Sequence, residues 1–167
     1  ILRAMLPIQR RYAELFCGEG WTPLVPTERP EVCASLWEGG GLRLWTLLNR
    51  SAQTCHGTLL KVQAGPGDRY FDLVRGLEAE STTVDGLVAL AGSIPPRGIG
   101  AFVAGKPAAL GKEFKKFLAR QARLQGRVSF DSSFTARRVE LGRSQPTAKQ
   151  TATPPGMAAL LALDVLL

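Results

Sequence analysis

The amino-acid sequence predicts a mainly β protein: an antiparallel β-sandwich with an N-terminal helix and with a basic C-terminal helix and linker. Short apolar segments alternate with Gly, Pro and Asp between residues 32 and 105, which is typical of compact all-β domains. These segments recur roughly every 10–15 residues, a spacing that favours a sandwich. The chain is 45% hydrophobic, which is enough to bury a core.

The N-terminal part is expected to be a helix followed by a connector. Apolar residues recur at helical spacing over residues 1–17, with Arg and Glu between them. Pro7 is expected to kink this helix or to mark its first turn, because proline lacks the backbone N–H. Residues 21–31 contain three prolines and are predicted to form an extended connector.

Six strands should follow. The glycines at 39–41 predict a hairpin turn, because glycine adopts positive φ without a Cβ penalty. Residues 42–48 are largely apolar on both faces, so this strand is expected in the centre of a sheet. Residues 64–68 predict a turn between the third and fourth strands. The strands are expected at residues 32–37, 42–48, 58–62, 70–74, 84–90 and 99–103.

The remainder of the chain has a different character. Residues 108–125 predict a basic amphipathic helix, residues 126–141 a hairpin or irregular segment, and residues 142–156 a linker. The expected organisation is a helix and connector, a β-sandwich domain, a basic helical extension, and a linker with an apolar end. Their boundaries are 1–31, 32–105, 106–141 and 142–167.

The net charge of +7 belongs to one segment. Residues 1–105 contain 10 basic and 10 acidic side chains, whereas residues 106–150 contain 11 and 3. Phe114 and Phe117, the aromatic residues around the lysines, fall on the apolar stripe of the predicted helix. A solvated helix packed on the sandwich, or a spacer, is therefore favoured, and nucleic-acid binding through phosphate charge is the alternative.

The two ends of the chain and its cysteines give further expectations. The chain begins at Ile1 and ends on an apolar run, so we expect a fragment of a longer protein. The start has no secretory signal pattern, and the final run is shorter than the roughly 20 residues that span a bilayer, so no membrane partner is expected. The three cysteines match no usual zinc spacing; three free thiols, buried or half-buried, are expected, with one disulfide as the alternative. No compartment is predicted.

Residues 1–105 resemble the end of a (β/α)8 glycoside hydrolase, namely its last barrel helix and its C-terminal β-sandwich domain. The resemblance rests on residues 10–16 and 20–26 and on the runs Leu44-Trp-Thr-Leu-Leu-Asn-Arg50, Tyr70-Phe-Asp-Leu-Val-Arg-Gly76 and Ile94-Pro-Pro-Arg-Gly-Ile-Gly100. It implies that the catalytic carboxylates lie on barrel strands upstream of Ile1. No catalytic residue or cofactor is therefore expected here, and the expected partner is that upstream barrel.

A second resemblance concerns the C-terminal end. Pro154-Pro-Gly-Met157 is similar to the start of a formylglycine-generating-enzyme-like domain, in which an apolar strand follows. The sequence matches the strand but lacks the glycine-rich continuation.

Aromatic residues are the candidate binding site. Trp37, Trp45 and Tyr70, with Trp21, predict a platform on which sugar rings stack, because aromatic side chains offer large flat contact areas. The alternative is packing in the core or against the barrel.

Other reactive side chains point to structural roles. Cys55 and His56 are neighbours on a strand, so their side chains point to opposite faces and cannot converge on one metal ion. Asp68 is expected to cap a turn and Asp72 to face solvent. The Asn49-Arg-Ser51 glycosylation pattern is interpreted as a chance match.

The expected function is that of a non-catalytic accessory domain, a scaffold for a carbohydrate-active enzyme. One alternative is an independent carbohydrate-binding module that uses surface tryptophans. The other is a nucleic-acid-binding basic segment.

Overall fold

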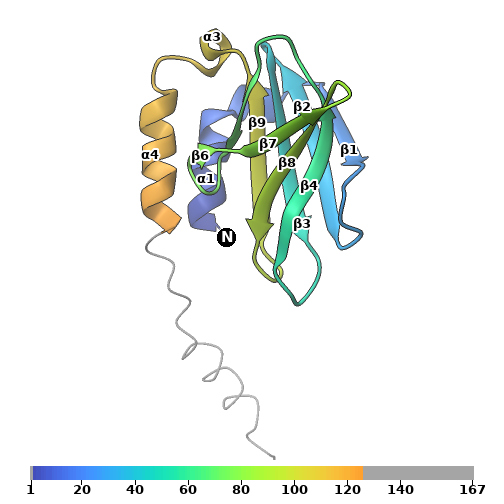
Figure 1. Cartoon of the computed structure of the whole chain (residues 1–167). Helices are drawn as coiled ribbons and strands as arrows, with labels where there is room; N and C mark the ends of the chain where they lie inside the picture. The colour runs from blue at the N-terminus through green and yellow to red at the C-terminus, as the bar shows by residue number, and fades with distance from the viewer. Residues whose placement is uncertain (1, 126–167) are drawn as a thin grey trace, which may run out of the picture. The chain divides into compact units, whose positions relative to one another are not determined.

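The computed structural model describes residues 2–125 of the chain and shows a mainly antiparallel β fold (Figure 1). The predicted fold class is confirmed. The elements are α1 (Leu2–Arg11), α2 (Ala13–Phe16), β1 (Trp21–Val25), β2 (Val32–Gly39), β3 (Leu42–Asn49), β4 (Cys55–Gln63), β5 (Arg69–Asp72), β6 (Leu77–Glu78), β7 (Glu80–Val84), β8 (Leu87–Ile94), β9 (Ile99–Gly105), α3 (Pro107–Leu110) and α4 (Phe114–Gln125).

Two sheets hold these strands. The large sheet has six strands in the order β1-β2-β3-β9-β5-β6, and the small sheet has three in the order β4-β8-β7. Every pairing is antiparallel. Strand β3 lies between β2 and β9, as its two apolar faces predicted.

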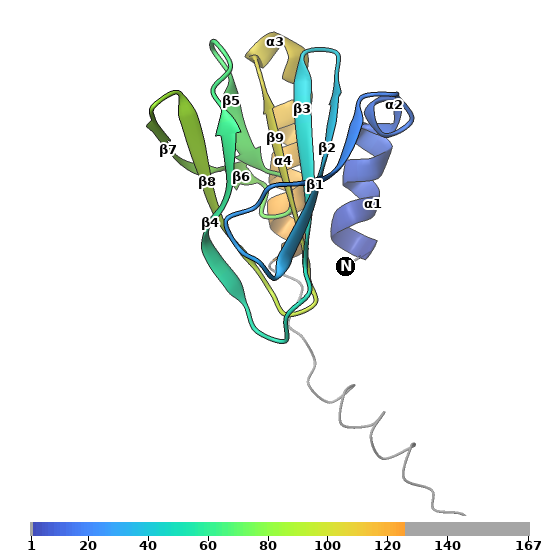
Figure 2. The same cartoon turned by 90° about the vertical axis from the view of Figure 1, so that its right-hand side faces the viewer.

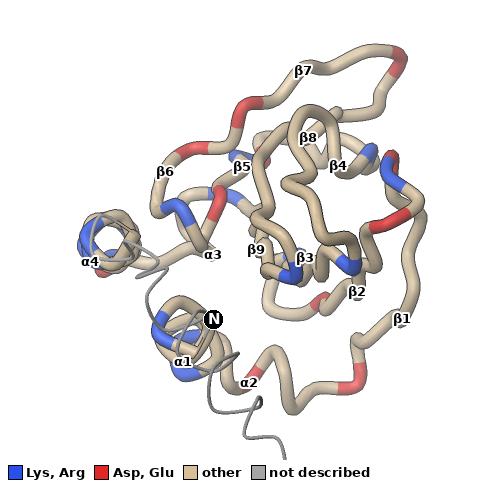
Figure 3. The backbone as a smooth tube through the Cα atoms, turned by 90° about the horizontal axis from the view of Figure 1, so that it is seen from below, with Lys and Arg blue, Asp and Glu red and all other residues tan. Residues whose placement is uncertain are grey.

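The large sheet is the middle of three layers. The small sheet covers one face, and α1 and α4 lie along the other, as Figures 2 and 3 show from two directions. Side chains alternate between the faces along each strand. On β3, Trp45 faces the small sheet and belongs to an inter-sheet core, whereas Leu44 faces the helices and belongs to a helix-side core with Ile8 and Phe114.

Two tight turns define the hairpins. Gly40 (φ 58°) and Gly41 (φ 74°) connect β2 to β3 at the predicted turn. The predicted strand at 84–90 is confirmed for residues 87–90, which lie in β8, but it begins too early, because Asp85 (φ 53°) and Gly86 (φ 76°) form a turn. An Asp-Gly pair favours a two-residue hairpin turn of this kind, and it separates β7 from β8.

The predicted connector contains an edge strand. Residues 21–25 form β1, which pairs with β2 with a register shift between Thr22 and Val25. An edge strand tolerates Pro23, because its N–H side needs no ladder partner. Residues on both sides of the expected boundary at 31/32 thus share one sheet, and the division into domains stays a prediction.

The predicted helices are present but interrupted. The N-terminal helix breaks at Tyr12 into α1 and α2, with Pro7 inside α1. The basic helix divides at Gly111 (φ 80°) into α3 and α4. Phe114, Leu118 and Gln121 of α4 are buried, while its lysines and arginines are exposed, so this helix packs on the sandwich as expected.

The predictions for residues 126–141, 142–156 and 157–167, including the formylglycine-generating-enzyme-like start, lie outside the described residues. Within residues 2–125, no helix combines the length and apolar character needed to cross a membrane.

Candidate functional site

The three predicted carbohydrate-binding residues do not share a face. Trp45 (3% exposed) and Tyr70 (8% exposed) lie in the inter-sheet core. Trp37 is opposite Leu44 in the β2–β3 register and packs on the helix side of the same sheet. The fold therefore separates Trp37 from the other two, and glycan binding by these residues stays a prediction.

Trp21 is the exposed aromatic residue of the group. It lies opposite Trp37 in the β1–β2 pairing, and the two rings stack with centroids 6.3 Å apart. Phe16 packs edge-on against Trp37 at 4.9 Å. Trp21 itself is 55% exposed. Because residues 21–31 contain three prolines, the sequence predicted a connector and not a strand. No sheet face could therefore be assigned to Trp21.

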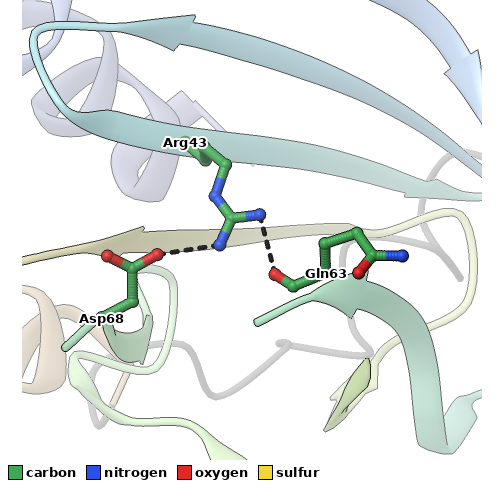
Figure 4. Close-up of polar contacts among 3 residues, drawn as sticks. All are labelled: Arg43, Gln63 and Asp68. Atoms are coloured by element: carbon green, nitrogen blue, oxygen red, sulfur yellow. Dashed lines mark hydrogen bonds and ion pairs between the residues drawn. The ribbon is translucent and has the colours of Figure 1, made fainter. Parts of the chain in front are cut away.

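Arg43 and Asp68 form an ion pair that ties the two sheets together (Figure 4). Arg43 Nη2 donates to Asp68 Oδ2 at 2.8 Å, and Nη1 donates to the carbonyl of Gln63, the last residue of β4, at 2.9 Å. The guanidinium lies 5.4 Å from the centroid of the Trp45 ring. The Asp68 carboxylate therefore joins β3 to the loop that follows the small sheet's first strand.

Asp72 is buried (5% exposed), so the prediction that it faces solvent is wrong. Phe71 faces the helices, which turns its neighbour Asp72 toward the small sheet. Burial raises the pKa of the Asp72 carboxyl, and backbone N–H groups and the Arg75 charge oppose this shift. Oδ1 accepts the N–H groups of Val74 (3.0 Å) and Arg75 (2.8 Å), which compensates for the lost hydration and sets the turn after β5.

Cys55 and His56 do not form a reactive pair. The Cys55 thiol is buried and donates to Glu31 Oε1 at 3.3 Å, while His56 is exposed. Burial and the Glu31 carboxylate raise the pKa of this thiol, which keeps it protonated and a poor nucleophile. All three cysteines are free, as expected, but only Cys55 is buried and Cys33 half-buried; the expectation of a covered thiol is wrong for Cys17, which is exposed. Between residues 2 and 125, no three His, Cys, Asp or Glu side chains gather as metal ligands would.

Asn49 is completely buried and fully bonded. Its Nδ2 donates to the carbonyls of Gln53 (2.7 Å), Ile94 (3.2 Å) and Pro95 (3.0 Å), and its Oδ1 accepts from the Ser51 N–H and hydroxyl (both 2.9 Å). A side chain in this position is closed to a glycosylating enzyme while the chain is folded. The geometry supports the interpretation of the Asn-Arg-Ser pattern as a chance match.

A cavity of about 330 Å³ opens where α1 and α2 meet α3 and the β2–β3 turn. Arg11 spans this junction by donating from Nη2 to the carbonyl of Leu110 at 2.7 Å. Arg11 Nε and the Tyr12 hydroxyl are buried and have no hydrogen-bond partner within residues 2–125. Burial raises the pKa of Tyr12, and the Arg11 guanidinium opposes the shift. The lining includes Arg11, Tyr12, Glu14, Glu38, Gly39 and Gly40.

This cavity could not be predicted from the sequence, because its lining residues are far apart along the chain. Arg11 and Leu110 are 99 residues apart, and the sequence identifies Arg11 only as a charged position between the apolar residues of a helix. The local signal available was the Gly39–Gly41 run, which predicts a turn and nothing about what packs over it.

Comparison with known proteins gives a weak result. No family model matches the chain, and no curated protein matches it significantly in sequence. One similar solved structure is the glycoside hydrolase family 30 subfamily 8 xylanase Xyn30A from Clostridium acetobutylicum, with 12% identity and a TM-score of 0.38. Another is a GH30 endoxylanase from Clostridium papyrosolvens C71, with 15% identity and a TM-score of 0.38.

Both matches cover 61% of this chain, which spans only 28% of the length of either xylanase chain.

Proposed function

We propose that residues 2–125 form a non-catalytic accessory domain of a glycoside hydrolase, which supports a catalytic domain located elsewhere in the same parent chain. The proposal starts from the sequence resemblance. It takes its main structural support from what the residues of that resemblance do in the fold.

The observation that carries the proposal is that two of the resembling runs bond to each other. Asn49, from the first run, donates to the carbonyls of Ile94 and Pro95 in the third. The backbone adds a bond from the Asn49 N–H to the Gly98 carbonyl at 3.0 Å and one from Arg97 N–H to the Ser51 carbonyl at 3.1 Å. These bonds therefore hold the end of β3 against the connection between β8 and β9, which is a structural role.

Three reactive side chains that the sequence offered as candidates have structural roles. Asp68 pairs with Arg43, Asp72 bonds to two backbone N–H groups, and Cys55 bonds to Glu31. None of these groups is left with the exposed, unpartnered geometry of a nucleophile or a general base. Because these three side chains stabilise the fold, they favour a structural role for the domain over a catalytic one.

The N-terminal elements present apolar side chains to solvent. Leu2 and Leu6 on α1 are 70% and 41% exposed, and Trp21 and Leu24 on β1 are 55% and 77% exposed. Exposed apolar side chains in groups favour contact with another protein surface. A neighbouring domain of the parent enzyme is the partner that the resemblance implies.

The test uses the parent protein recovered from the reading frame around this chain. We expect truncation after Pro26 to lower the soluble yield and the melting temperature of the catalytic domain, because it removes the sheet on which α1 and β1 pack and exposes their buried side chains. Deletion of residues 142–167 alone is the control and should change neither. An equally soluble and stable truncated enzyme would contradict the proposal.

The isolated chain tests the two alternatives. Retardation in polysaccharide-containing gels that is lost on Trp21→Ala or Trp37→Ala would favour a carbohydrate-binding module. Salt-sensitive binding to nucleic acid that is lost when the exposed basic residues of α4 and its approach are neutralised would favour the nucleic-acid alternative. Those residues are Lys112, Lys115, Lys116, Arg120 and Arg123.

A further inference from the structure

We propose that the outer face of α1 and α4 docks on the catalytic domain of the parent enzyme, at a surface that is acidic around an apolar patch. This inference rests on the proposed function and adds to it the chemistry of the contact and the participation of α4. We call the docking surface the basic face. Its charged side chains are all exposed, and they are Arg3, Arg10, Lys115, Lys116, Arg120 and Arg123.

The charge of the helices is not neutralised within the domain. Residues 2–11 and 106–125 contain nine basic side chains and one acidic side chain, whereas residues 12–105 contain seven basic and ten acidic side chains. Four of those seven basic side chains form ion pairs with carboxylates. Within residues 2–125 the basic face has a single ion pair, between Lys116 and Glu113 at 3.3 Å. An uncompensated cationic surface attracts an acidic partner and repels a basic one.

Cations from opposite ends of the chain meet on this face. Gln121 Nε2 donates to the carbonyl of Ala4 at 3.0 Å, which joins the second half of α4 to the first turn of α1. At the other end of this contact, the Arg11 guanidinium lies 5.1 Å from the centroid of the Phe117 ring. Figure 3 shows the two helices next to each other, each with basic residues. The basic face is therefore a product of the fold, and the basic segment of the sequence supplies only part of it.

The cations lie on the side of the helices that faces away from the sheet. Ile8 of α1 (0% exposed) and Gln121 of α4 (1% exposed) mark the inner side of each helix. Arg10 and Arg123 each follow two residues later, which is a rotation of about 200° around the helix axis. Each of these two arginines has another cation of the basic face seven residues, or about two turns, before it. Two rows of cations therefore share the outer surface of the helix pair.

Exposed leucines beside the cations identify the kind of partner. Leu2 and Leu6 are 70% and 41% exposed and lie one turn apart on α1. A nucleic-acid backbone offers nothing to these leucines, whereas a protein surface offers both apolar side chains and carboxylates. An anionic lipid surface also offers both. The catalytic domain is favoured over lipid because the proposed function places it in the same chain, where attachment raises its effective concentration to about the millimolar range.

The direct test is carbodiimide cross-linking of the intact parent enzyme, which joins a lysine amine to a carboxylate in contact with it. We expect cross-links from Lys115 or Lys116 to Asp or Glu residues of the catalytic domain. Lys61 of β4 is the internal control, because it pairs with Glu28 at 2.9 Å and should cross-link within its own domain. If the Lys61–Glu28 cross-link forms and the lysines of the basic face reach no residue of the catalytic domain, the proposal is wrong.

A pair of variants tests the charge of the contact. Arg120→Gln combined with Arg123→Gln should lower the melting temperature of the catalytic domain in the parent by about 2–4 °C at low salt. The shift should largely disappear at about 0.5 M NaCl, where exposed charges are screened. The matched control is Arg50→Gln combined with Arg97→Gln, which removes two exposed arginines from the connections between strands and should have no effect. Equal shifts in both double variants, or an equal fall in the melting temperature of the isolated 167-residue chain, would overturn the proposal.

The outcomes separate this inference from the proposed function. If truncation after Pro26 destabilises the catalytic domain but the cross-links and the variant shift are absent, the supporting role stands and the contact through the basic face is refuted. If the cross-links form but truncation has no effect, the domains dock and the supporting role is refuted. Binding of the isolated chain to phosphatidylserine vesicles or duplex DNA, lost in the Arg120→Gln and Arg123→Gln variant and without cross-links in the parent, would assign the basic face to that partner and overturn the proposal.

Discussion

The two faces of the large sheet satisfy their polar groups differently. On the inter-sheet face, Asn49 uses both ends of its amide, and Arg43 bonds to Gln63 and Asp68. On the helix face, Arg11 Nε, the Tyr12 hydroxyl and Gln121 Oε1 have no partner within residues 2–125. The Tyr70 hydroxyl has none either, nor has Nε of Arg29, whose guanidinium donates to the His56 carbonyl of β4. Unpartnered buried atoms therefore occur on both sides of the sheet, but on the inter-sheet face Asn49 and Arg43 each bond through several atoms.

The helix face also depends on contacts between segments that are distant in sequence. Gln121 Nε2 donates to the carbonyls of Ala4 and Leu73, both at 3.0 Å, and thereby connects α4 to α1 and to the turn after β5. Gln125 Nε2 donates to the Val74 carbonyl at 2.9 Å. A perturbation of this face should therefore release a whole helix, whereas one at the inter-sheet face should loosen a single turn.

The largest expected effect comes from Gly76, which lies directly under α4. Its φ is +69°, and an added Cβ would overlap the backbone of Ala122 and Leu118. We expect Gly76→Ala to displace α4 and to lower the free energy of unfolding by about 4 kcal/mol or more, as for severe overpacking combined with backbone strain. Denaturant unfolding measures this change, and hydrogen exchange of the α4 amides shows whether the helix is released.

Gly67 provides the matched control. Its φ is +75°, but a Cβ there would meet nothing within 4 Å, so Gly67→Ala isolates the conformational strain at about 1–2 kcal/mol. If the two substitutions cost the same, the close packing of α4 on Gly76 is not what determines the loss.

On the inter-sheet face, Asn49→Ala should be the most harmful side-chain truncation. It leaves the carbonyls of Gln53, Ile94 and Pro95 without their donor and Ser51 without its acceptor. We expect a loss of about 2–4 kcal/mol in the free energy of unfolding, since several buried groups lose partners together. Thermal unfolding measures it, with Ser51→Ala as a milder control. If Asn49→Ala lowers the free energy of unfolding by less than Ser51→Ala does, water takes over the hydrogen bonds of the Asn49 amide.

The Arg43–Asp68 pair should contribute less. Both side chains are only partly exposed, 21% and 12%, so solvent screens the pair incompletely. We expect Arg43→Met, which retains apolar packing near Trp45, to lower the free energy of unfolding by about 1–2 kcal/mol. A double-mutant cycle with Asp68→Asn should give a coupling energy of about 1 kcal/mol. A coupling energy of zero would mean that the Gln63 carbonyl alone holds the guanidinium.

Sequence analysis predicted the parts of this fold that have a local cause. The apolar character of both faces of 42–48 predicted the central position of β3, and Gly39–Gly41 predicted its turn. The start of the strand at 84–90 was wrong because β7 is exposed along its whole length and mostly polar, so apolar alternation did not show where β7 ends. The Asp85–Gly86 pair was the available signal.

The sites were less accessible to sequence analysis because burial depends on which layers cover a strand. Alternation correctly places Trp45 opposite to Leu44, but it does not show that the small sheet covers Trp45 and leaves Trp21 exposed. The same limit applies to Asp72. Alternation along β5 assigns its side chain to one face of the sheet, but it does not show that this face is buried. The cavity at Arg11 requires α3, which no local pattern near residue 11 indicates.

The smallest expected effect concerns the pH dependence of the inter-sheet face. Because burial raises the pKa of Asp72 in the folded state, folding favours its protonated form. The stability that this preference contributes is fully present below the pKa of Asp72 in the unfolded chain. It is lost as the pH rises through the higher pKa of the folded state. Asp72→Asn retains an oxygen for the Val74 and Arg75 N–H groups and stays uncharged at every pH.

The Asp72→Asn variant should therefore be more stable than the wild type at pH 7, by less than any of the changes above. The difference should shrink toward zero as the pH falls below the unfolded-state pKa. Denaturant midpoints measured at a series of pH values for both proteins test this. If Asp72→Asn is instead less stable at pH 7 and the gap closes on acidification, the carboxylate is stabilised by its two N–H bonds and by Arg75 more than burial disfavours it. The inter-sheet face would then satisfy this charge as completely as it satisfies the Asn49 amide.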